Sequence, residues 1–402
     1  MDKYHRELHI SKHINLSRFL HNKYNDLIIS DSIRLVALAM VSLYVPIYLI
    51  QKNFSYLEVT LYEFLLFTGS IFFHYIVLKK IKTIGVRKIL IISYFLNIFL
   101  YLILFYLDFL VAKIGGSNYL VVIGFINIMA TVFYWTSHHI YFLKATKAEN
   151  EGEKLGLLQG IPTVFAISAP LIGGVIITDY GFSGVFLISV MLLIVASLFL
   201  FFSENIEYEE NCEIKEILDF SHMKKNIIFF VQGIGHASVA FVWPILLFVL
   251  SLELISMGFL FLFSDIAYAL VCYFGGKSVD KNGSRSVGRI GAVGHGSSMV
   301  FRAFSTTILT LTTFQAMGGL FGGLLHVALD SGFYKHSHNN ISNSLMNREL
   351  YMHLGRLFVI FIFLSLLAVL SIKQALVYSL VAAGLLTFSL VLLLNDKESI
   401  FE

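Results

Sequence analysis

Long apolar blocks separated by short polar segments organise this chain from residue 29 onward. A helix needs about 20 residues to cross the roughly 30 Å hydrocarbon core of a bilayer. The blocks are too long for barrel strands, and a backbone in hydrocarbon must pair its own amides. The pattern therefore predicts an all-α integral membrane protein with twelve transmembrane helices, near 29–50, 56–78, 88–108, 118–143, 155–177, 184–202, 226–250, 256–277, 287–306, 309–332, 350–371 and 375–395.

Composition and the distribution of cations agree with this topology. Hydrophobic residues make up 57% of the chain, charged residues only 14%, and the mean hydropathy is +0.78, which excludes an ordinary soluble domain. Of the 29 Lys and Arg residues, four fall on or towards the outer side of the twelve-span arrangement, and they are Lys52, Lys113, Arg302 and Lys373. The positive-inside rule therefore predicts cytoplasmic N- and C-termini in a multi-pass protein of the inner (plasma) membrane.

The composition gives little support for a nucleic-acid partner, a disulfide framework, a cysteine metal site or a signal peptide. The net charge of +3 is accounted for by the inner loops, and no extended basic tail indicates a nucleic-acid partner. Cys212 and Cys272 provide neither a disulfide framework nor the spacing of a metal site. The first 25 residues are polar and lack the apolar region of a cleavable signal peptide. We predict a lipid-embedded monomer with no cofactor.

The second half of the sequence repeats landmarks of the first half at an offset of about 198 residues, as the numbering shows. The segment starting at Pro46 matches the one starting at Pro244, and Gly85 matches Gly283. Duplication of a six-helix unit explains this offset, and paired repeats with a binding site between them are a known transporter arrangement. The predicted organisation is a cytoplasmic arm, an N-terminal bundle, a charged cytoplasmic linker, a C-terminal bundle and a cytoplasmic tail, at 1–28, 29–202, 203–225, 226–395 and 396–402.

A short polar turn between the eighth and ninth spans carries the most specific motif. Residues 276–285 read G-K-S-V-D-K-N-G-S-R, which resembles the cytoplasmic signature loop of the major facilitator superfamily of transporters. The resemblance implies that Asp280 faces the positive N-terminal end of the eleventh helix and latches the two halves closed. Lys281 and Arg285 would flank it, Gly276 would allow close helix packing, and Gly283 would form the turn.

The equivalent loop of the first half departs from this motif. It keeps Gly85 and Arg87, but Lys82 stands where the aspartate is expected, and Leu78 replaces the first glycine. Either other charges, such as Glu149, Glu151 or Glu153, latch that half, or its gate is looser.

The fifth span contains a second motif of the same superfamily. Gly156, Pro170, Gly173 and Gly174 fit the G-P-x-x-G-G signature associated there with proton-coupled exporters, whereas Ala169 stands in place of a glycine. Small residues also let helices approach closely in lipid. Tight packing and an export function are therefore both consistent with the segment.

Ionisable residues inside the spans are candidates for coupling or substrate binding, because they are costly at membrane depth. Asp265 is the preferred proton carrier, with a bond to Arg302 or to a tyrosine as the structural alternative. His236 and Glu63 are further carriers or ligand contacts. Aromatic, imidazole and amide side chains on other spans suit a cavity wall, namely Trp135, His138, Tyr44, Gln159, Gln232 and Trp243.

No metal site is predicted, although His5, His9 and His13 would share one face if the arm were helical. Neither a nucleotide-binding G-x-x-x-x-G-K-[ST] motif nor a convincing nucleophile–base pair is present, so we do not expect an enzyme. The resemblance implies a secondary active transporter that moves a small organic solute by alternating access, coupled to protons. The alternative is a receptor or assembly factor derived from such a transporter that no longer transports.

Overall fold

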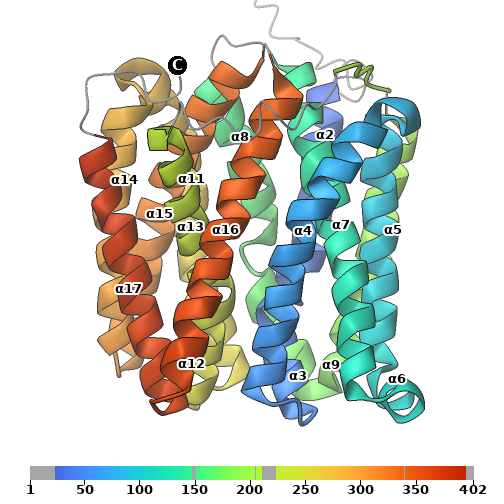
Figure 1. The fold of residues 1–402 in the computed structure, drawn as a ribbon, viewed down its shortest axis with the longest axis vertical. Helices are drawn as coiled ribbons and strands as arrows, with labels where there is room; N and C mark the ends of the chain where they lie inside the picture. Colours follow the sequence, from blue (N-terminus) through green and yellow to red (C-terminus); the bar gives the residue numbers. More distant parts are fainter. Residues whose placement is uncertain (1–22, 147–150, 204, 211–222, 339, 395–402) are drawn as a thin grey trace, which may run out of the picture.

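The computed structural model describes residues 23–146, 151–203, 205–210, 223–338 and 340–394, and it is a bundle of long helices without strands in these segments (Figure 1). The N-terminal half contains α2 (Lys23–Ala39), η1 (Ser42–Tyr44), α3 (Val45–Gln51), α4 (Tyr56–Ile84), α5 (Val86–Phe105), α6 (Leu107–Ile114), α7 (Gly116–Ala145), α8 (Glu151–Ala166) and α9 (Ala169–Phe202). The C-terminal half contains α11 (Met223–Ala237), η3 (Ser238–Val242), α12 (Trp243–Val249), α13 (Leu254–Asn282), α14 (Ser284–Phe304), α15 (Ile308–Ser337), α16 (Ile341–Leu367) and α17 (Ile372–Leu393).

These elements form twelve membrane crossings, which confirms the predicted fold class. Ten helical stretches among the described residues are long and apolar enough to cross a membrane, and one of them, Glu151–Phe202, has 52 residues. At 1.5 Å per residue such a stretch would span about 78 Å, more than twice a bilayer core. It turns at Gly181, whose φ is 73°, so it contains the fifth and sixth crossings. The shorter, glycine-rich α14 is the ninth crossing.

The internal repeat is visible in where the helices break. The first crossing is divided into α2, η1 and α3, and the seventh into α11, η3 and α12. Pro46 and Pro244 lie in the first turn of α3 and α12, where a residue without an amide hydrogen is tolerated. Gly85 and Gly283 end α4 and α13 at φ 99° and 81°, backbone angles that favour glycine. Landmarks 198 residues apart therefore have the same structural roles.

Successive crossings run in opposite directions, so an even number of them leaves both described ends of the chain on the same side. We call the side that is uppermost in Figure 1, where α2 begins, the upper end, and the side with α3, α6 and α12 the lower end. Helix α2 begins at Lys23, inside the segment predicted as an arm, and most of the predicted arm, linker and tail lies outside the described residues. The predicted domain limits therefore stay a prediction, and His5, His9 and His13 lie outside the described residues.

The two halves meet along two pairs of helices. Helix α13 packs against α8 and α9, and α16 packs against α4. Figure 1 shows α4 and α16 adjacent in the middle of the molecule, with the C-terminal helices on the left and the N-terminal helices on the right. The eighth crossing thus packs against the fifth, and the eleventh crossing packs against the second. This interface contains the residues described next.

Candidate functional site

Buried ionisable side chains gather at the interface between the two halves. We call them the central polar network, and they come from α2, α4 and α7 on one side and from α15 and α16 on the other: Asp31, His74, His138, His139, Asp330, Arg348, Glu349, His353 and Arg356. All of them are at least half-buried, and Arg348 and Glu349 are each only 4% exposed. Charges buried at membrane depth require partners, and these residues provide them for one another.

Asp31 is the centre of the N-terminal part of the network. One carboxylate oxygen lies 2.8 Å from His138 Nε2. The other accepts hydrogen bonds from Tyr134 at 3.0 Å and from Tyr94 at 3.3 Å. The Arg34 guanidinium lies 3.2 Å from the centre of the Tyr134 ring, a cation–π contact. The carboxylate therefore has an acid–base partner and two hydroxyl donors in a water-poor site.

Arg348 is the centre of the C-terminal part. It donates to Glu349 at 2.7 Å and to Asp330 at 2.9 Å. Asp330 also accepts from Gln159 of α8 at 3.2 Å and from Gln232 of α11 at 3.1 Å. Since Gln159 belongs to the N-terminal half, this hydrogen bond crosses the interface. A movement of one half against the other would change the partners of Asp330.

Glu349 faces three imidazoles. Its carboxylate oxygens lie 3.6 Å from His74 Nε2 and 3.7 Å from the Nε2 atoms of His139 and His353. His74 and His139 come from α4 and α7, and Glu349 and His353 come from α16. The Nδ1 atom of His139 is hydrogen-bonded to the Tyr334 hydroxyl of the C-terminal half. Imidazoles of both halves thus converge on a single carboxylate.

The residues predicted for coupling or substrate binding divide into two groups. His138, Gln159 and Gln232 belong to the network or hydrogen-bond to it, and Trp135 stacks on His139 with ring centres 5.4 Å apart. The Tyr44 hydroxyl instead donates to the backbone oxygens of Pro170 at 2.6 Å and Leu254 at 3.1 Å. The Trp243 ring is fully buried and lies 5.3 Å from the Arg302 guanidinium. Tyr44 and Trp243 thus have packing roles.

Of the predicted proton carriers, Asp265 is half-buried on α13 and does not pair with Arg302. Arg302 instead donates to Gln315 at 2.7 Å and to Ser298, whereas a bond from Asp265 to a tyrosine stays a prediction. His236 lies against His326, with ring centres 4.7 Å apart. Glu63 is half-buried on α4 and within electrostatic reach of Arg356.

The Asp280 carboxylate caps a helix, but not the predicted one. It accepts from the backbone amides of Gly152 at 3.1 Å and Glu153 at 2.9 Å, in the first turn of α8. The expectation that it faces the eleventh helix, α16, is therefore wrong. The reason is that α13 packs against α8, the fifth crossing, whereas α16 packs against α4. The physical role of the contact is the expected one, an anion at a helix N-terminus.

Close packing of α13 on α8 depends on glycine. A Cβ atom on Gly276 would collide with the Gly152 carbonyl oxygen, and one on Gly156 would collide with the Cys272 carbonyl oxygen. Further along, Gly173 packs against the Met40 backbone and Gly174 against the Leu254 backbone. The motif residues of the fifth crossing therefore serve helix packing, which accounts for them without a direction of transport.

The start of α16 is also capped by a carboxylate, which belongs to Glu210 of the linker between the halves. The Ser342 amide donates to Glu210 at 3.1 Å, and the Tyr208 hydroxyl is hydrogen-bonded to the Ser342 side chain. Lys144 of α7 lies 3.9 Å from the second Glu210 oxygen. Glu210 thus supplies a carboxylate at the start of α16, although the first-half loop has Lys82 in place of the aspartate. Of the substitutes suggested by the sequence, Glu151 pairs with His338 and Glu153 with Lys277, and Glu149 lies outside the described residues.

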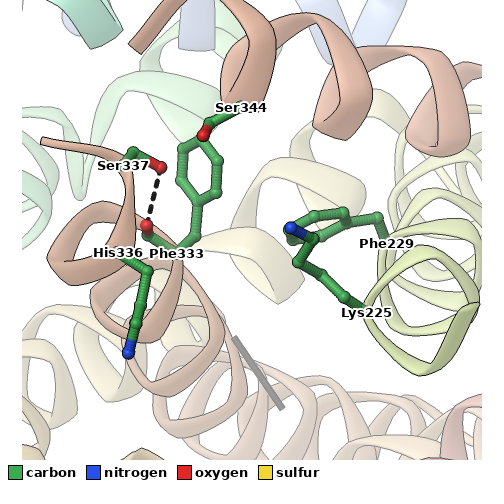
Figure 2. Close-up of a pocket in the computed structure, with 6 residues that line it drawn as sticks. All are labelled: Lys225, Phe229, Phe333, His336, Ser337 and Ser344. Carbon is green, nitrogen blue, oxygen red and sulfur yellow. Dashed lines mark hydrogen bonds between the residues drawn. The ribbon is translucent and has the colours of Figure 1, made fainter. Parts of the chain in front are cut away.

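Figure 2 shows a small pocket elsewhere, at the upper end of the C-terminal half. It is lined by Lys225 and Phe229 of α11, by three residues of α15 and by Ser344 of α16. All of these helices belong to the C-terminal half, and the Phe333 ring of the pocket lies 5.2 Å from the Arg348 guanidinium of the central polar network.

Comparisons with known proteins match most of the chain. The family described as Major Facilitator Superfamily matches residues 27–347. The uncharacterized protein YqgE of Bacillus subtilis (strain 168) is 20% identical over 368 residues, covering 87% of this chain and 84% of that protein. The human organic anion transporter MFSD10 superimposes with a TM-score of 0.66 at 9% identity, covering 92% of this chain and 99% of that one. The E. coli fucose:proton symporter FucP gives 0.67 at 12%, covering 94% and 100%. At these identities the two structures establish the fold alone.

Proposed function

Because this chain belongs to the major facilitator superfamily, we propose that it is a secondary active transporter that moves a small organic solute by alternating access. The observation that carries the proposal is the central polar network, in which ionisable side chains of both halves meet at their interface. Transporters built from two repeats place their binding sites between the repeats near the midplane. Rocking of the halves would break and remake contacts such as that between Gln159 and Asp330.

We propose proton coupling through Asp31 and His138. The two side chains are buried and 2.8 Å apart, so a proton can pass between the carboxylate and the imidazole. Protonation of the carboxylate, or loss of the imidazole proton, would remove the attraction between them. The state of this pair can thus be linked to the position of α2 relative to α7. Asp265, His236 and Glu63 are retained as secondary candidates for the same role.

The orientation and the latch follow from the same proposal. The excess of Lys and Arg in the segments at the upper end favours a cytoplasmic upper end in the plasma membrane. Asp280 would then hold the start of α8 to α13 at the cytoplasmic mouth. Gly276, Lys281, Gly283 and Arg285 complete that latch, and Glu210 provides the equivalent contact at α16. We expect the transporter to function as a monomer.

The alternative of a receptor or assembly factor without transport was suggested by the first-half loop, which lacks an aspartate. Glu210 supplies a carboxylate at the corresponding helix start, at 3.1 Å from the Ser342 amide. The departure of the loop from the motif therefore no longer favours loss of transport, and we prefer the transporter.

The proposal is tested in liposomes that contain the purified protein and an imposed pH gradient. A panel of organic anions, sugars and amines is added, and proton flux is followed with a pH-sensitive dye. We expect solute-dependent proton flux that Asp31→Asn abolishes and that Asp108→Asn, at an exposed surface pair, leaves unchanged. If no solute of a broad panel moves protons through a well-folded protein, proton-coupled transport is refuted.

A further inference from the structure

Three residues of the central polar network form a cluster with the composition of a metal site. His74 of α4 and Glu349 and His353 of α16 each place a ligand atom within 4.8 Å of the other two. All three side chains are buried, the least buried being Glu349 at 4% exposure. We propose that this His74–Glu349–His353 triad binds a divalent transition-metal ion, which the protein carries as a complex with a small organic carboxylate. The transport part rests on the proposed function, whereas metal binding stands by itself.

The distances between the ligand atoms fit a metal better than hydrogen bonds. Glu349 Oε2 lies 3.6 Å from His74 Nε2 and 3.7 Å from His353 Nε2, beyond hydrogen-bonding distance, which is about 2.7–3.2 Å. Metal–ligand distances of about 2.1 Å in a tetrahedral site separate neighbouring ligand atoms by about 3.4 Å. The two distances to Glu349 are within a few tenths of an ångström of that spacing, and all three ligand atoms lie within 4.8 Å of one another.

His74 is prepared for coordination by its surroundings. Its Nδ1 atom is hydrogen-bonded to the Thr136 hydroxyl at 2.9 Å, while its buried Nε2 atom has no hydrogen-bond partner. A neutral imidazole that donates through Nδ1 directs the lone pair of Nε2 into the triad. Metal-binding histidines have this arrangement, in which a second group fixes the tautomer. An unpaired buried nitrogen is otherwise unfavourable, and a metal ion would satisfy it.

Two arginines next to the triad indicate that the ion binds together with an anion. Arg348 donates to the other oxygen of Glu349 and to Asp330. Arg356 Nη1 lies 3.3 and 3.4 Å from the two ring nitrogens of His353. Because it is shared almost equally between them, it is not directed at the lone pair of Nε2. Among the described residues, no carboxylate lies within ion-pair distance of Arg356. A carboxylate on the metal's chelator would supply that partner.

The donor set also limits the choice of ion. Two imidazoles and a carboxylate suit Zn²⁺, Fe²⁺, Co²⁺ or Mn²⁺, whereas Ca²⁺ and Mg²⁺ prefer oxygen ligands. Three protein ligands leave at least one coordination position open, as in sites that exchange a bound molecule. The open position is where a carboxylate of the solute would bind. Because α4 and α16 belong to opposite halves, the ion would also hold the halves together.

The binding test uses the purified full-length protein in detergent, with zinc chloride in calorimetry and cobalt chloride in absorption spectroscopy. Loss of an outer-shell partner of a metal-bound histidine lowers affinity about 10–100-fold. We therefore expect at least 100-fold weaker zinc binding in His74→Gln and His353→Gln and about 10-fold weaker binding in Thr136→Val. His326→Gln, which changes a histidine outside the triad, serves as the matched control and should bind zinc normally.

Two results would overturn the metal site. One is equal zinc affinity in the wild type and in folded triad variants, and the other is binding of Ca²⁺ or Mg²⁺ as tight as that of Zn²⁺. If the variants do not fold, the cobalt spectrum of the wild-type protein decides, because it must report imidazole nitrogen ligands. A spectrum with oxygen ligands only refutes the triad.

The transport test uses liposomes and radioactive zinc, added as the chloride or with equimolar citrate. We expect uptake with citrate and not with chloride, and loss of uptake in His74→Gln. Uptake of zinc without a chelator refutes the complex as cargo. Zinc binding with no uptake in either form refutes transport and leaves the site intact, whereas organic solute flux without zinc binding refutes the site and leaves the transporter intact.

Discussion

Asp280→Asn is expected to open the upper end between α13 and α8. The carboxylate accepts two backbone amides, at 3.1 and 2.9 Å, in the first turn of α8. A hydrogen bond to a charged group contributes about 1.5–3 kcal/mol and a neutral one about 1 kcal/mol, and a charge at a helix end adds about 0.3–1 kcal/mol. Asparagine keeps one neutral acceptor and loses the charge. The closed state should lose about 1–3 kcal/mol, a shift of about 5–150-fold in the equilibrium.

Spin labels at Lys80→Cys and Lys335→Cys measure this opening by electron paramagnetic resonance, because both positions are exposed at the upper end and belong to opposite halves. We expect a longer distance to gain population in Asp280→Asn and more so in Asp280→Ala. Asp108→Asn, at the exposed pair with Lys52, is the control that should leave the distances unchanged. Identical distance distributions in the wild type and in Asp280→Ala would refute the latch.

Three further substitutions test other contacts. Glu210→Gln should open the upper end less than Asp280→Asn in the same resonance experiment, by about 0.3–1 kcal/mol, because it caps through one amide. Gly276→Ala should cost about 1–3 kcal/mol in thermal unfolding through its collision with backbone, whereas Gly275→Ala meets only a movable side chain and should cost less. Arg348→Gln should destabilise by about 3–5 kcal/mol in the same assay, and Asp330→Asn should restore part of the loss; unchanged melting would contradict the buried ion pair.

The fold could be predicted because the membrane imposes it. Apolar blocks of bilayer length and a repeat offset near 198 residues define the crossings and their pairing into halves. The matched breaks after Pro46 and Pro244, and the matched turns at Gly85 and Gly283, follow from the same repeat. These constraints come from the bilayer and the backbone, so no contact between side chains has to be known.

The centre of the site could not be predicted as well, for a specific reason. Arg348 and Glu349 precede the apolar block expected from 350, yet α16 begins at Ile341, so they lie about 12 Å inside the helix at 1.5 Å per residue. Asp31 is similarly placed about 12 Å into α2, counted by the same helical rise. Arg348 and Glu349 face neighbouring helices and not lipid, so hydropathy placed them in the loop before the eleventh span, and it placed Asp31 at the edge of the first span, predicted from 29. His74 is an ionisable residue inside the predicted second span, the same signal that singled out Glu63, but its contact with Glu349 of the other half could not be read from the sequence.

The origin of Glu210 has a consequence for control of the protein. At the interface of α13 with α8, the capping carboxylate is Asp280 of α13 itself. At the start of α16 it is Glu210 of the linker, which lies between Lys144 and Ser342. Cutting, lengthening or chemically neutralising that linker would therefore remove the contact at α16 and leave the contact of Asp280 with α8 in place. A partner or modification that acts on residues 205–210 can therefore weaken one of the two capping contacts without altering the other.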